Sequence, residues 1–140
     1  MRSLNEILER AKLILPTKAK PSFPHVWDPA SYARHPHGGW YNMYCAEVGQ
    51  DAAIADDALM MQGRLLDTAR LSGLAIMSGG TVSGEARVLE EAVVANKATV
   101  GDQAVITGSA IVMDHGRVLQ FGEVSDRATV KDGGSVTDHG

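Results

Sequence analysis

A repeat of six residues runs through most of this 140-residue chain, and it constrains the fold more than any other feature. From residue 83 onward the chain divides into the hexapeptides SGEARV, LEEAVV, ANKATV, GDQAVI, TGSAIV, MDHGRV, LQFGEV, SDRATV and KDGGSV. In each of them the fourth residue is Ala or Gly and the sixth is Val or Ile. A disordered segment has no reason to keep aliphatic residues at a fixed spacing, so the repeat predicts an ordered solenoid.

The same register extends back to about residue 43 if two units, 61–65 and 78–82, are each one residue short. The fourth and sixth residues are two apart, so they point to the same side of a short strand. The second residue, usually Gly, Asp or Asn, suits a corner. Three such sides make one coil, which is therefore three hexapeptides long, less a single residue where a unit is short. About five coils would form a rod roughly 25 Å long, with Ala and aliphatic side chains stacked inside.

The cycles at 82–87 and 106–111, VSGEAR and ITGSAI, resemble those of the hexapeptide-repeat proteins, and the resemblance covers residues 43–140. It implies a single-stranded left-handed parallel β-helix, which is an exception to the right-handed crossover rule. It implies no single function, because these repeats occur in trimeric acyltransferases, in γ-type carbonic anhydrases and in non-catalytic modules.

Residues 1–42 lack the repeat, and we expect them to form a helix and a capping segment in front of the β-helix at 43–140. Ser3 and Glu6 have the spacing of a capping box, which predicts a helix over residues 3–14 that ends before Pro16. Residues 16–36 contain all five prolines, and most of the aromatic residues follow or overlap them. Since the end of a solenoid needs a cover, we expect an aromatic cap over the first coil, formed by Phe23, Trp27, Trp40 and Tyr41.

The fifth residue of each unit points outward and therefore shows what each side of the rod meets. On one side these fifth residues are mostly apolar, and each follows the previous one by a single coil: Leu59, Ile76, Val93, Ile111 and Thr129. A contiguous apolar stripe on an exterior marks an interface. Two occupants remain open: the N-terminal helix folded back along the rod, or the same side of another subunit. We expect a homo-oligomer, preferably a trimer, joined through Leu59, Ile76, Val93 and Ile111.

On a second side, Arg70 and Arg87 are expected to lie one coil apart. Like charges at that distance repel unless an acidic partner or an anionic ligand lies nearby, although screening by solvent makes the penalty small. The pair is therefore either a weak anion site or simply solvated.

The histidines are the main candidates for catalysis. His35 and His37 offer two metal ligands, but no carboxylate or cysteine has a suitable spacing beside them, so we predict no metal site. His115 and His139 are separated by one coil plus one side and would not stack, which argues against a carbonic anhydrase. Acyltransferases of the family that the chain resembles use a histidine as general base and bind coenzyme A. His115 and His35 are the candidates for that role, and nothing in the sequence selects either.

Composition excludes several other classes. The net charge of −4 argues against a nucleic-acid partner, since phosphate neutralisation needs surplus Lys and Arg. Cys45 is the single cysteine, so no intrachain disulfide and no cysteine-based zinc site can form. No apolar run reaches the roughly 20 residues that span a membrane, and the charged N-terminus is unlike a signal peptide. We therefore expect a cytoplasmic protein that does not bind membranes.

Taken together, these features favour a non-catalytic scaffold or protein-interaction module that acts as an oligomer, needs no cofactor and binds another protein. The alternative is a trimeric acyltransferase of the hexapeptide type that uses an acyl-coenzyme A donor. Binding of coenzyme A distinguishes the two.

Overall fold

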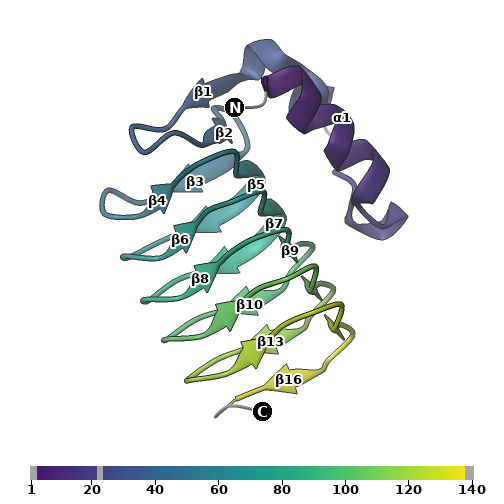
Figure 1. Cartoon of the computed structure of the whole chain (residues 1–140), viewed down its shortest axis with the longest axis vertical. Helices are drawn as coiled ribbons and strands as arrows, with labels where there is room; N and C mark the ends of the chain where they lie inside the picture. The colour runs from purple at the N-terminus through teal and green to yellow at the C-terminus, as the bar shows by residue number, and fades with distance from the viewer. Residues whose placement is uncertain (1–2, 22–23, 138–140) are drawn as a thin grey trace.

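The computed structural model describes residues 3–21 and 24–137 and shows parallel coils stacked into a solenoid of about five turns (Figure 1). Its one described α-helix, α1, lies at the N-terminal end. Three short 3-10 helices follow it: η1 (Thr17–Ala19), η2 (Pro24–Trp27) and η3 (Pro29–Ser31). The helix and the strands are α1 (Leu4–Ile14), β1 (Tyr32–Arg34), β2 (Trp40–Asn42), β3 (Ala46–Val48), β4 (Ala53–Ile54), β5 (Leu59–Leu65), β6 (Arg70–Leu71), β7 (Ile76–Val82), β8 (Arg87–Val88), β9 (Val93–Val94), β10 (Thr99–Val100), β11 (Val105–Ile106), β12 (Ile111–Val112), β13 (Arg117–Val118), β14 (Glu123–Val124), β15 (Thr129–Val130) and β16 (Ser135–Val136).

The interior of the rod is the aliphatic stack that the hexapeptide predicts. Every sixth-place side chain from Ile54 to Val118 is fully buried, at 0% exposure. The alanines at the fourth place pack into the same cluster, from Ala52 to Ala110. Burial of one Val, Leu or Ile side chain stabilises a fold by about 1.5–3 kcal/mol, so this linear core accounts for the regularity of the coils.

The outward side chains form three walls, each a column of residues in parallel register. The helix wall carries Leu59, Ile76, Val93, Ile111 and Thr129. The arginine wall, on the five-stranded sheet of β4, β6, β8, β11 and β14, carries Ala53, Arg70, Arg87, Val105 and Glu123. The threonine wall carries Glu47, Arg64, Thr81, Thr99, Arg117 and Ser135.

The corners are formed by second-place residues in the left-handed backbone conformation, which Asn and Asp tolerate best after glycine. Asp56, Asp67 and Asp102 all have φ of 57°. Their side chains accept hydrogen bonds from backbone N–H groups one coil further on, as when Asp67 Oδ2 accepts from Gly84 N at 2.9 Å. Each such corner therefore joins two coils as well as turning the chain.

The two short units lie where one corner is missing. The strands β5 and β7 have seven residues each and continue through that corner, so the helix wall and the threonine wall belong to one 11-stranded sheet. Gly63 and Gly80 allow this path, with φ of 102° and 84°. A Cβ atom on Gly63 would lie 2.6 Å from the carbonyl oxygen of Gly80, so the coils here stack too closely for a side chain.

The N-terminal segment covers the first coil (Figure 1). Strands β1 and β2 form an antiparallel hairpin, and β2 then pairs in parallel with β5, placing Trp40 beside Leu59 and Tyr41 beside Met60. Tyr41 packs against the axial core. Trp27 donates a hydrogen bond from Nε1 to a backbone carbonyl oxygen of the cap. Phe23, the remaining expected cap residue, lies outside the described residues.

Helix α1 lies against the helix wall and covers three of the four residues of the expected subunit interface, while Ile111 is half-buried. The predicted capping box is present, with Glu6 N donating to Ser3 Oγ. One buried cluster contains both the helix residues Ile7, Leu8 and Ala11 and the wall residues Leu59, Ile76 and Val93. The first two of these wall residues are 0% exposed and the third is 3% exposed. Of the two occupants that the sequence leaves open, the structure places the helix there, and these three side chains are inaccessible to a second subunit.

Candidate functional site

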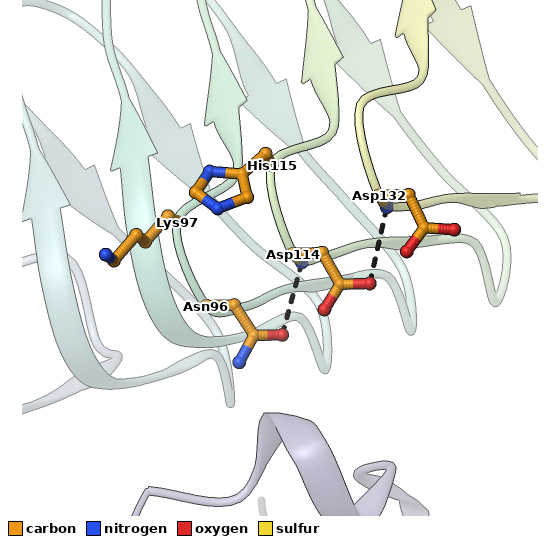
Figure 2. Close-up of a pocket in the computed structure, with 5 residues that line it drawn as sticks. All are labelled: Asn96, Lys97, Asp114, His115 and Asp132. Atoms are coloured by element: carbon orange, nitrogen blue, oxygen red, sulfur yellow. Dashed lines mark hydrogen bonds between the residues drawn. The ribbon is translucent and has the colours of Figure 1, made fainter.

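A polar groove beside His115 runs along the column of corner residues Asn96, Asp114 and Asp132. A cavity of about 520 Å³ is lined there by Asn96, Lys97, Asp114, His115 and Asp132. Figure 2 shows the three corner residues in a row along successive coils, while Lys97 and His115 lie on the same side of that row. Asp114 N donates to Asn96 Oδ1 at 3.2 Å, and Asp132 N donates to Asp114 Oδ2 at 3.3 Å. The corner side chains thus accept hydrogen bonds from the backbone of the next coil.

His115 is exposed at this groove. Its backbone N–H donates to the carbonyl oxygen of Asp132, which fixes the turn and leaves the imidazole at the groove (Figure 2). An accessible imidazole can exchange a proton with a bound hydroxyl or amine. Lys97 beside it supplies one positive charge, and the carboxylates of Asp114 and Asp132 line the same groove.

His35, the second histidine candidate, belongs to a different place in the fold. It lies in the turn between β1 and β2, at the capped end of the rod, and lines a cavity of about 460 Å³ with Tyr41 and Glu47. Burial lowers the pKa of His35, and the neighbouring His37 lowers it further. The two rings stack at 5.3 Å, and His37 N donates to His35 Nδ1 at 3.2 Å. The structure therefore does not bring His35 and His115 together.

Arg70 and Arg87 are direct register partners on the arginine wall, as their spacing predicts. Both are exposed, and they line an open cavity of about 410 Å³ with Thr68, Glu85 and Gln103. Glu85 accepts a hydrogen bond from Gln103 at 3.3 Å. Two guanidinium groups one coil apart suit a carboxylate or a phosphate, which they can bind with paired N–H groups.

One further pocket was not expected from the sequence. A cavity of about 530 Å³ lies where the corner is missing, and Gly63, Gly79 and Gly80 form part of its lining. The rings of His25 and Tyr44 line the same cavity, with centroids 4.9 Å apart. The two short units were the available signal, because a lost corner residue leaves a hollow. Nothing local in the sequence indicated that the cap would place His25 and Tyr44 there.

Buried Asn42 fixes this part of the cap. Asn42 is 0% exposed, and its Nδ2 donates to the carbonyl oxygen of His25 at 3.0 Å. Its Oδ1 accepts from the backbone N–H groups of Tyr44 and Cys45 at 2.9 and 3.1 Å. One side chain therefore ties the η2 turn to the loop after β2.

Within residues 3–21 and 24–137, no three His, Cys, Asp or Glu side chains gather in a way that could hold a metal ion. In the same part of the chain, no helix is long and apolar enough to cross a membrane. Comparison with protein-family models, curated proteins and solved structures finds no match to this chain.

Proposed function

We propose that this chain is a rigid, non-catalytic interaction module, a left-handed β-helix of the hexapeptide-repeat type that acts as a homo-oligomer. The support is the way the solenoid displays its outer side chains. Because the axial core is fully buried from Ile54 to Val118, neighbouring coils stay in register. The outward residues therefore form fixed columns rather than independent groups.

The observation that carries the proposal is the pair of open walls beside the covered one. Helix α1 occupies the helix wall, whereas the charged residues of the arginine and threonine walls are exposed. Both open walls repeat one side chain per coil, at the roughly 4.8 Å spacing of paired strands. Columns of charged and polar groups at fixed spacing suit an extended contact with another protein surface, where complementary charges favour one partner over others. Subunit contacts in the proposed oligomer would use one of these two walls.

A titration with acetyl-coenzyme A, followed by calorimetry, tests the non-catalytic assignment. We expect no saturable heat with the full chain at millimolar ligand. Saturable heat that disappears in His115→Ala but remains in His25→Ala would contradict the proposal of a non-catalytic module and would favour an enzyme. The His25 variant is a suitable control, because its imidazole is also exposed but lies at another cavity.

The second candidate is an acyltransferase that uses an acyl-coenzyme A donor, and one observation favours it. His115 and Lys97 line the same open groove, which offers a general base and one cation for a phosphate group beside the carboxylates of Asp114 and Asp132 (Figure 2). The same titration decides between the candidates, and an assay for acyl transfer to small amines and alcohols would extend it.

A further inference from the structure

The arginine wall carries charges of both signs that form no ion pair within the part of the chain that the structure describes. Arg70, Arg87 and Glu123 are exposed, and none of the ion pairs among the described residues includes them. The threonine wall differs, because its Glu47 is already paired with Arg64 at 3.4 Å. Charges of opposite sign remain available on the arginine wall for a contact outside the chain.

Arg87 and Glu123 lie one row away from Val105 on opposite sides, and Arg70 lies one row beyond Arg87. In the five-stranded sheet, Val105 is the register partner of Arg87 on one side and of Glu123 on the other. Val105 is itself a half-buried apolar residue on this outer surface. A twofold axis that runs along the strands through Val105 exchanges the row of Arg87 with the row of Glu123. Such an axis generates a contact in which residue i meets residue j and residue j meets residue i.

We propose that the arginine wall binds a second copy of this chain in antiparallel orientation, with Val105 against Val105 and Arg87 of each copy against Glu123 of the other. This inference rests on the homo-oligomeric part of the proposed function and names its contact surface. Opposite charges then face each other twice across the interface, which is favourable. A parallel arrangement about an axis along the rod would place Arg87 opposite Arg87, and like charges disfavour it.

An exposed aromatic ring at the edge of the same wall adds apolar area to the contact. Phe121 is 53% exposed and stands two residues before Glu123. The same twofold axis brings it to the turn before β8 of the second copy, where Glu85 and Arg87 offer aliphatic stems. The strands on this wall are only two residues long each, so the contact is small and the dimer is expected to be weak and salt-dependent.

Sedimentation equilibrium of the full chain over a wide concentration range tests the proposal. Arg87→Glu and Glu123→Arg should each weaken self-association by about tenfold or more, because each places like charges face to face. An equimolar mixture of the two variants should associate again. In the mixed dimer the introduced glutamate meets the introduced arginine in one half of the interface, and the native pair meets in the other. Arg117→Glu, an exposed charge reversal on the threonine wall, should associate as the wild type does.

Several results would overturn the dimer. One is failure of the mixture to associate when both single variants are folded by circular dichroism. Another is a larger effect of Arg70→Glu than of Arg87→Glu, which would require a different register. A third is a wild type that stays monomeric at every concentration. If inorganic phosphate then binds in an Arg87-dependent way, the arginines form an anion site instead. None of these concerns acetyl-coenzyme A, so the non-catalytic assignment stands or falls separately.

Discussion

The phenolic hydroxyl of Tyr32 donates a hydrogen bond of 2.7 Å to the carbonyl oxygen of Val26, and both residues are buried in the cap. Burial raises the pKa of Tyr32 well above its ordinary value; the hydrogen bond with Asn42 lowers it in part, and the nearby Cys45 raises it. The cap therefore keeps this tyrosine neutral.

We expect alkaline pH to loosen the cap through Tyr32. The pKa is raised in the folded protein, so the contribution to stability is complete below the ordinary tyrosine value of about 10 and is lost as the pH rises above it. Urea unfolding at pH 8 and pH 11 should show a larger loss for the wild type than for Tyr32→Phe. Tyr44→Phe, at a 67% exposed position, is the control and should lose as much as the wild type. Equal losses of stability in all three proteins would show that Tyr32 is not the group responsible for the pH dependence.

Asn42→Ala should unfold the cap more readily than any exposed substitution in it. The change removes the three hydrogen bonds that Asn42 makes to backbone groups, and it leaves the carbonyl oxygen of His25 and two N–H groups without their partner. We expect a loss of at least about 2 kcal/mol in the free energy of unfolding, measured in urea. Asn5→Ala on the exposed face of α1 is the matched control, with an expected change within about 0.5 kcal/mol. A cap that tolerates both substitutions equally would show that Asn42 does not hold it together.

Gly39→Ala should destabilise the junction between cap and coil. A Cβ atom there would overlap Cγ2 of Ile54 and would lie 2.9 Å from the carbonyl carbon of the same residue, so the backbone has to move. We expect a cost of about 1–3 kcal/mol. Gly133→Ala is the control, because nothing lies within 4 Å of its added methyl group. Similar midpoints of unfolding for the two variants would show that the backbone at the junction can move without a loss of stability.

Asp102 tests the hydrogen bonds by which corner side chains join one coil to the next. Asp102→Ala removes the acceptor of the Gln120 N–H group and puts alanine at a φ of 57°. The expected loss is about 1–2 kcal/mol from the hydrogen bond and the left-handed conformation together. Asp102→Asn keeps an acceptor oxygen and tolerates that conformation, so its unfolding midpoint should stay close to that of the wild type. A loss as large in the Asn variant would mean that charge, not geometry, holds the corner.

Ile76→Asp tests the packing of α1 on the helix wall. The change puts a carboxylate at a position that is 0% exposed and packed against α1, and the cost of burying this charge weakens the contact with the helix. The amide hydrogens of residues 4–14 should therefore exchange at least about tenfold faster. Thr129→Asp, at the exposed end of the same wall, is the control and should leave that exchange unchanged. A fall in molecular mass caused by Ile76→Asp, with α1 still protected, would instead indicate a subunit contact there.

Short-range patterns in the sequence predicted much of the fold. The sixth-place series placed Ile54 and Val118 inside, and the capping box of Ser3 and Glu6 located the helix, because both signals lie within a few residues. The regular coil length likewise placed Arg70 beside its register partner on the arginine wall.

Contacts between distant segments were beyond the sequence pattern. The position of α1 depends on groups such as Arg10, whose Nη1 donates to the carbonyl oxygen of Leu74, 64 residues away. The pocket lined by His25 and Tyr44 likewise combines the cap with two short coils. Asn42 gave no signal at all, since a polar residue in a short strand looks like any exposed one until its burial is known.

The regular coil has a consequence for how such a chain can change in evolution. A duplication or loss of one whole coil, three hexapeptides, returns every later residue to the same wall, so the rod can grow or shrink while each surface keeps its character. The two shortened coils mark a corner where a single-residue deletion is absorbed, by glycine and a straightened strand. Within the other strands of the described coils, an insertion or deletion of one residue would turn the buried side chains outward and destabilise the rod.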